Sequence, residues 1–308
     1  MSTNGAPTKE EEDPSSDGES RSLCHNCFER RPNVRACAQC KSAMYCSKTC
    51  QKEDWPLHKL KCLSLAAIHS SPMTRLMGRF QNHPYLTTFL SLALFHKFQA
   101  LGRDLPSKTP LTAQIFFGVE PADIQEFGHL RTKKNFHRRT GDPVTGILQV
   151  LSIVIPSQIS PGAAKYMPNF QSMRAVLDEK GLSSAHLVIV EFFSCSARDS
   201  KAIFGGLTTT LALPSDPQMH KTLTIPQMSY GQDDIVKTTT WQTCLEFINM
   251  EIRVDVQNEY RLQKKMTRQD EEMIMWAMTG GNCTDEFGEE VLTAWRDKVS
   301  REDIYSMK

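Results

Sequence analysis

Several features that mark common protein classes are missing from these 308 residues. Residues 1–20 hold no apolar run of the kind that a secretory signal needs. The longest apolar runs, near 86–95 and 147–155, are too short to cross a bilayer. The formal net charge is only +1, so the overall charge indicates no polyanionic partner. We therefore expect a protein of the nucleus or the cytoplasm, where thiols stay reduced.

Motifs that carry catalysis are also missing. The sequence has no Gly-x-Gly-x-x-Gly loop, no Walker loop, no Gly-x-Ser-x-Gly elbow and no His-Glu-x-x-His pair. Cys195 follows an apolar run and is expected to be an inert buried thiol. The sequence therefore favours a protein without a catalytic role.

The composition divides the chain into four parts. Residues 1–22 are rich in Ser, Glu, Gly and Pro and are expected to be a disordered acidic tail. A cysteine-rich module at 24–62 and a helical connector at 63–109 follow, and residues 110–308 are expected to form an α+β domain of unknown function. The fold class is thus a small cysteine-rich module with short helices, followed by an α+β domain.

Periodicity predicts the elements of the larger part. We expect helices at 57–70, 84–101, 169–181 and around 291–299, the last behind a cap at Thr284, and strands at 112–119, 146–155, 185–193 and 206–213. Residues 250–257 fit a strand by alternation, but Trp241, Leu245, Ile248 and Ile252 fit a helix, so both readings stay open.

Seven of the ten cysteines lie within residues 24–62. With one histidine they form four pairs: Cys24 and Cys27, Cys37 and Cys40, Cys46 and Cys50, His58 and Cys62. A Cys-x2-Cys turn directs two thiolates at one ion, and residues four apart share one helix face. Eight ligands predict two tetrahedral Zn²⁺ sites without an open position, which makes them structural sites that stabilise a module too small for its own core. Spacing alone leaves sequential and cross-braced pairing open.

The segment between the last two pairs is expected to contain a break. Cys46 and Cys50 would lie on one helical turn, and a second helix would begin with Asp54 as its cap and Pro56 in its first turn. That break would direct His58 and Cys62 at a different ion.

These ligands, together with the intervening Tyr45, Gln51 and Trp55, resemble a MYND zinc finger. The resemblance implies cross-bracing: one zinc held by Cys24, Cys27, Cys46 and Cys50, the other by Cys37, Cys40, His58 and Cys62. It also implies protein binding, since fingers of this family in transcriptional co-repressors hold short Pro-containing peptides along an edge strand. The matching peptide-binding positions here are Met44, Gln51 and Trp55, although Ala38 stands where those co-repressors have a small hydroxyl residue.

Two alternatives accompany the adapter or co-regulator function that this resemblance implies. Some MYND proteins are SET-domain lysine methyltransferases, but here no SET-like sequence precedes the finger, and "NHPY" at 82–85 matches the cofactor motif only at its start. A basic stretch at 131–139 could contact nucleic acid, although a solvated loop is the simpler explanation; its cations are Arg131, Lys133, Lys134, Arg138 and Arg139.

Overall fold

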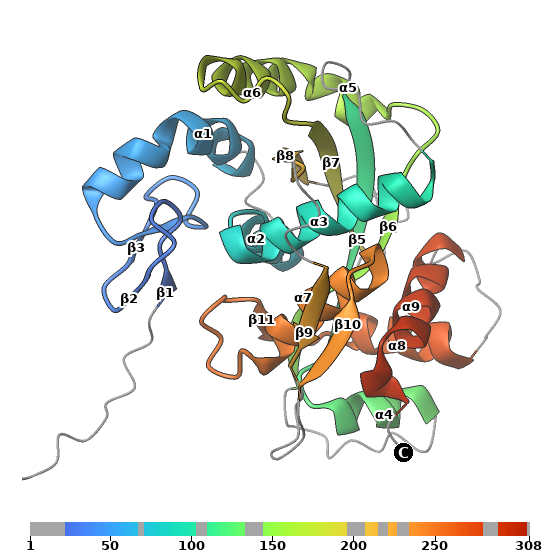
Figure 1. The fold of residues 1–308 in the computed structure, drawn as a ribbon. Coiled ribbons are helices and arrows are strands. Elements are labelled where there is room, and N and C mark those ends of the chain that lie inside the picture. Colours follow the sequence, from blue (N-terminus) through green and yellow to red (C-terminus); the bar gives the residue numbers. More distant parts are fainter. Residues whose placement is uncertain are drawn as a thin grey trace, which may run out of the picture.

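The computed structural model describes residues 22–66, 71–102, 110–132, 144–195, 207–214, 221–226, 234–279 and 289–306. At its N-terminal end lies a small module with four short strands and one helix: β1 (Ser22–Leu23), β2 (Arg30–Arg31), β3 (Arg35–Ala36), β4 (Met44–Tyr45) and α1 (Lys48–Ala66). β1 pairs with β2 and β3 pairs with β4, both antiparallel. Figure 1 shows this module, in blue, on one side of a larger domain. Among the helices described, none combines the length and apolar character needed to cross a membrane.

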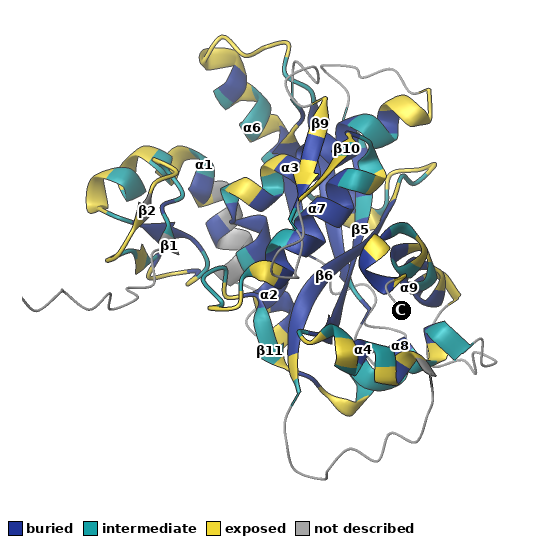
Figure 2. Ribbon diagram, turned by 60° about the horizontal axis from the view of Figure 1, so that its bottom comes forward, coloured by how far each residue is buried: buried dark blue, intermediate teal, exposed yellow. Residues whose placement is uncertain are grey.

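A five-stranded mixed sheet is the centre of the larger domain. Its order is β11-β6-β5-β7-β8, and its strands are β5 (Leu111–Pro121), β6 (Thr145–Val154), β7 (Leu187–Ser194), β8 (Leu207–Ala212) and β11 (Gln263–Lys265). β5 and β7 run parallel, and the other neighbours run antiparallel. A separate hairpin pairs β9 (Thr222–Ile225) with β10 (Ile235–Thr238). Figure 2 shows that the central strands are almost wholly buried, as their apolar sequences require.

Helices cover both faces of this sheet. They are α2 (Pro72–Gln81), α3 (Pro84–Ala100), α4 (Ile124–Thr132), α5 (Pro161–Lys165), α6 (Met167–Glu179), α7 (Trp241–Val254), α8 (Arg268–Thr279) and α9 (Glu289–Arg301), followed by the 3-10 helix η3 (Asp303–Tyr305). Phe117 of β5 packs against Phe80 of α2, with ring centroids 5.0 Å apart. The next residue, Gly118, faces Trp295 of α9, where a Cβ atom would collide with the indole. Because successive side chains of a strand point to opposite faces, α2 and α9 lie on opposite sides of the sheet.

Side chains from α7 and α9 form hydrogen bonds with the backbone of β6 near an irregularity in its pairing with β5. The register with β5 shifts between Phe116 and Phe117, which leaves Leu151 as the extra residue of a bulge. The amide of Asn249 in α7 pairs with Val150 as a strand would, accepting from its N–H at 2.7 Å and donating to its carbonyl at 2.9 Å. Arg301 donates to the carbonyl of Leu151 at 3.0 Å. Side chains thereby pair backbone groups of β6 next to the bulge, beyond the end of β11.

A buried network of charges fastens the C-terminal residues to the sheet. Glu120 of β5 is fully buried and pairs with Arg253 of α7 and with Lys298 of α9. The hydroxyl of Tyr305 donates to Glu120 at 2.7 Å, and Lys298 also pairs with Glu302 at 2.9 Å. Burial raises the pKa of Glu302, but Lys298 and Arg301 outweigh that effect and lower it overall. The network therefore links α7, α9 and η3 to β5 through buried polar and charged side chains.

Most elements expected from the sequence are present. The helix expected at 84–101 is α3, and the helix expected at 169–181 is α6. The four expected strands are β5 to β8, and residues 250–254 belong to the helix α7, which settles that ambiguity. A zinc-finger module followed by helices and a mixed sheet is confirmed as the general architecture. The acidic tail up to residue 21 and the cap expected at Thr284 lie outside the described residues.

Candidate metal centre and peptide surface

The structure gathers the eight candidate ligands into two groups. Cys24, Cys27, Cys46 and Cys50 form one, and Cys37, Cys40, His58 and Cys62 form the other. Within each group, the ligand atoms all lie within 4.8 Å of one another. Each group combines one Cys-x2-Cys turn with one pair from the 46–62 segment, so the two groups interleave along the chain.

The distances inside these groups fit zinc. Sγ of Cys46 lies 3.7 Å from Sγ of Cys27 and 3.5 Å from Sγ of Cys50, and Sγ of Cys37 lies 3.8 Å from Sγ of Cys62. A tetrahedron with zinc–sulfur bonds of about 2.3 Å has edges of about 3.8 Å. A disulfide would bring two sulfurs to about 2.05 Å, so these thiols are not oxidised. The groups are consistent with two Zn²⁺ ions.

The histidine of the second group fits the same geometry. Nε2 of His58 lies 3.6 Å from Sγ of Cys40. A zinc–nitrogen bond of about 2.0 Å and a zinc–sulfur bond of about 2.3 Å predict a separation of about 3.5 Å. All four members of this group are buried, which would exclude water from an ion held there.

Backbone amides and neighbouring sulfurs set the acidity of the thiols. Burial raises the pKa of the Cys24 thiol, but the N–H groups of Cys27, Cys46 and Asn26 outweigh it and lower that pKa to about 7. The hydrogen bond with Cys50, and then burial, raise the pKa of Cys46 to about 12. The neighbouring thiols thus hinder the ionisation of Cys46, and a divalent cation between them would remove that hindrance.

The two Cys-x2-Cys turns share one backbone conformation. The residues that follow them, Phe28 and Lys41, have φ angles of 58° and 57°. Each donates its N–H, over 3.0 Å, to the carbonyl of the first cysteine of its turn, Cys24 or Cys37. Neither is glycine, so holding this left-handed conformation costs free energy that the rest of the module must supply.

The helix break expected near Asp54 is wrong. α1 runs without interruption from Lys48 to Ala66 and contains Pro56. Its first turn is capped by Ser47, whose hydroxyl accepts from the N–H of Cys50 at 3.1 Å. At 1.5 Å per residue, Cys50 and His58 lie about 12 Å apart along the helix axis, so length alone separates the two groups. Asp54 instead accepts a hydrogen bond of 2.6 Å from Tyr45.

The outer edge of β4 is already occupied at Met44. Its carbonyl accepts from the backbone N–H of His25 at 2.8 Å, and its own N–H donates to Nδ1 of the same histidine. The Met44 side chain is buried, with its sulfur 3.9 Å from Nη1 of Arg261. In this arrangement a peptide strand cannot add at Met44 without displacing His25. Sequence reasoning missed this role, because His25 reads as a possible extra ligand and no spacing rule indicates a strand cap.

The other two predicted peptide-binding residues are more accessible. Trp55 is 37% exposed, and its ring lies 5.9 Å from that of His58. Gln51 is partly exposed one helical turn earlier on α1. These positions place an aromatic ring and an amide one turn apart on α1, with the ring beside His58 of the second ligand group.

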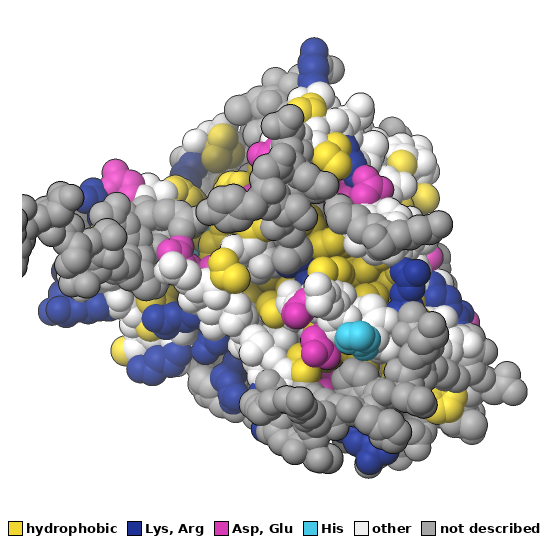
Figure 3. Space-filling view, turned by 90° about the horizontal axis from the view of Figure 1, so that it is seen from below, with side chains coloured by type: hydrophobic (Ala, Val, Ile, Leu, Met, Phe, Trp, Pro, Cys, Tyr) yellow, Lys and Arg dark blue, Asp and Glu magenta, His cyan; other side chains and the backbone are white. Residues whose placement is uncertain are grey.

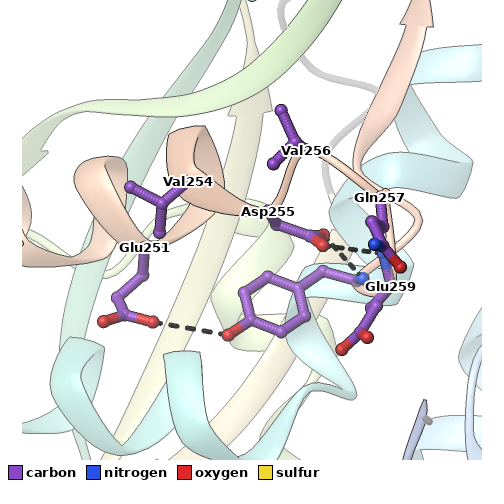
Figure 4. A pocket seen from close by; sticks show the side chains of 7 residues that line it. Glu251, Val254, Asp255, Val256, Gln257 and Glu259 are labelled. Atoms are coloured by element: carbon purple, nitrogen blue, oxygen red, sulfur yellow. Dashed lines mark hydrogen bonds between the residues drawn. The ribbon is translucent and has the colours of Figure 1, made fainter. Parts of the chain in front are cut away.

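Described residues of the larger domain line at least two pockets. One, of about 270 Å³, follows the end of α7 and holds Glu251, Asp255 and Glu259 (Figure 4). The carboxylate of Asp255 accepts from the N–H groups of Glu259 and Tyr260 at 2.8 Å, so it serves its own loop. The second pocket, of about 590 Å³, lies between α9, the end of α3 and the edge of β6, with Trp241 and Phe116 in its lining.

The predicted nucleic-acid contact falls largely outside the described residues. Of its five cations, only Arg131 is described, and its guanidinium donates to the carbonyl of Tyr305 at 2.8 Å. That bond gives Arg131 a role in holding α4 to the C-terminal residues.

Comparison with known proteins assigns the two parts of the chain separately. The family model of the MYND finger matches residues 24–62. A second model, described as a domain of unknown function, DUF8205, matches residues 68–305.

Curated relatives share only the region of the finger. N-lysine methyltransferase SMYD2 of Mus musculus is 37% identical over 91 residues, which cover 27% of this chain and 21% of that protein. The Gallus gallus protein of the same name is 37% identical over 87 residues (26% and 20%), and the Homo sapiens protein is 35% identical over 85 residues (25% and 20%). The chain therefore spans about a fifth of the length of these relatives.

Proposed function

Because this chain belongs to the DUF8205 family and carries a MYND finger at residues 24–62, we propose that it is a zinc-dependent adapter or co-regulator that recruits a protein partner through the finger. The observation that carries this proposal is the pair of ligand groups, each with four protein side chains at zinc distances. Such a site fills its coordination sphere and stabilises a surface instead of activating water.

The proposal assigns one Zn²⁺ to each ligand group. Cys24, Cys27, Cys46 and Cys50 would hold the first ion, and Cys37, Cys40, His58 and Cys62 the second. The zinc content of the purified chain tests this directly, with two ions per chain expected and a value near one contradicting the assignment.

We further propose that the partner peptide lies along α1 over Gln51 and Trp55. The exposed indole can stack on a proline ring, and the amide can pair with a peptide backbone. Met44 would join this surface through its backbone only after His25 withdraws from the edge of β4. The bound peptide would therefore contact mainly the helix side of the finger.

Substitutions on two equally exposed tryptophans test this surface. Trp55→Ala, with or without Gln51→Ala, should remove partners that the wild-type chain captures, because the stacking ring is lost. Trp276→Ala on α8 is the matched control, since that ring is also 37% exposed. An unchanged set of partners for Trp55→Ala, or equal losses for both tryptophans, would contradict the assignment.

Lysine methylation is the second candidate function, because the relatives that match the finger are named as N-lysine methyltransferases. The match to these relatives covers about a quarter of this chain, in the region of the finger, whereas residues 68–305 match a separate family. Calorimetry with S-adenosylmethionine and the full chain tests this candidate, and the absence of binding would end it.

We also propose a different division of the chain. Residues 63–109, which the sequence predicts as a helical connector, would belong to the same domain as the sheet. Phe80 of α2 contacts Phe117 and Phe192 of the sheet, and the family model begins at residue 68. The finger would then be presented directly by the larger domain.

A further inference from the structure

Three arginines gather where the finger meets the larger domain. Arg75 and Arg79 are four residues apart on α2, so they share one face of that helix. The guanidinium of Arg79 donates to the carbonyl of Arg261 at 2.8 Å. The guanidinium of Arg261 in turn lies 3.9 Å from the sulfur of Met44 in β4. This arginine cluster (Arg75, Arg79 and Arg261) therefore borders the finger.

The cluster has no counter-charge in the described part of the chain. None of the carboxylates described there lies within ion-pair distance of its three members. Burial lowers the pKa of Arg79, and the charges of Arg261 and Arg75 lower it further. Figure 3 shows Lys and Arg side chains gathered on the side of the molecule that holds the finger. Like charges held together in this way favour an anionic partner.

An acidic segment of the chain leads to this place. Residues 10–19 contain six acids: Glu10, Glu11, Glu12, Asp13, Asp17 and Glu19. The backbone of His25 is bonded to Met44, which contacts Arg261. Three residues span at most about 10 Å, so Ser22 lies within about 10 Å of His25. Residues 10–13 are within about 50 Å of His25 at full extension, which easily brings them to the cluster.

We propose that the acidic segment 10–19 docks on the arginine cluster and clasps the finger to the larger domain. The segment neutralises three charges that otherwise repel one another. Because it is tethered to the same chain, an acidic peptide from another protein must displace it to reach the cluster. This contact is independent of which partner binds over Trp55.

The test uses the full-length, zinc-loaded chain and a labelled peptide of residues 8–20 as the probe. Fluorescence anisotropy compares the wild type with a tail variant in which Glu10, Glu11 and Glu12 are changed to Gln and Asp13 to Asn. We expect the tail variant to bind the probe about tenfold more tightly, since its own segment no longer competes. The difference should shrink in high salt.

A second pair of variants locates the binding surface. Arg75→Gln with Arg261→Gln, added to the tail variant, should abolish the tight binding. Lys165→Gln with Lys180→Gln removes the same number of exposed charges from α5 and the end of α6, and should leave the binding unchanged. Zinc content and thermal unfolding verify that each variant is folded.

Two outcomes would overturn the proposal. If the wild type and the tail variant bind the probe equally, the segment does not occupy the cluster, and the cluster is open to acidic partners. If the arginine variant keeps the tight binding, the probe binds elsewhere. Neither outcome depends on the peptide surface at Trp55, so the two proposals fail separately.

Discussion

Replacing Glu120 by Gln tests the buried charge network with the smallest possible change in shape. The carboxylate of Glu120 is fully buried and faces Arg253, Lys298 and the hydroxyl of Tyr305. Gln removes the negative charge but keeps the side-chain volume. Arg253 would then lose its buried carboxylate partner, and Lys298 would keep only Glu302. Removing one partner from a buried ion pair typically costs about 3–5 kcal/mol.

That cost is a large part of the stability of an ordinary domain, which is about 5–15 kcal/mol. Denaturant unfolding of the zinc-loaded chain measures this cost. Tryptophan fluorescence reports on the unfolding, because Trp295 is buried beside Gly118, which lies on β5 like Glu120. The midpoint should fall by at least about a fifth of its wild-type value, as for about 3 of 15 kcal/mol, with little change in slope.

The matched control is Glu272→Gln on α8. Glu272 pairs with Arg268, whose side chain is 89% exposed, so its loss should cost less than about 1 kcal/mol. If Glu120→Gln costs no more than this control, the network does not hold the C-terminal elements, and the reasoning is refuted.

Three further outcomes follow from the same structure. Zinc affinity, measured by competition with a chelator, should fall by at least tenfold per pH unit at each site between pH 7.5 and 6.0. The pKa values of Cys46 and Cys62 are raised, so these thiols must release protons to bind zinc. An affinity that does not change with pH would contradict this. Cys62→Ser should lower the zinc content below two ions per chain, and an unchanged content in elemental analysis would remove Cys62 from the ligands. Gly118→Ala should cost about 1–3 kcal/mol in denaturant unfolding through its clash with Trp295, whereas Gly128→Ala, with open space at its Cβ position, should cost nothing.

The sequence predicts the finger better than any other part of the chain. Cysteine and histidine ligands must recur at fixed spacing, because a small ion accepts only four donors at defined distances. The four long strands were also predictable, since most of their residues are buried on both faces and form apolar runs, as in Val188, Ile189 and Val190 of β7. Local chemistry dominates in these segments, so the sequence carries the signal directly.

The missed features depend on contacts between distant residues. Pro56 suggested a helix start, but α1 continues through it because ligands at both ends of the helix belong to packed groups. The closure of β4 by His25 joins residues 19 positions apart, and the pairing of Glu120 with Lys298 joins residues 178 positions apart. No local pattern encodes such partners.

The uninterrupted α1 helix makes the two metal sites cooperative. It carries Cys50 of the first ligand group and both His58 and Cys62 of the second, so an ion bound at either site restricts the position and rotation of the whole helix. The second ion then meets a preorganised pair of ligands and binds with less loss of conformational entropy. Loading and loss of zinc should therefore be close to all-or-none, and the surface at Trp55 should switch on and off as a single unit with the metal supply.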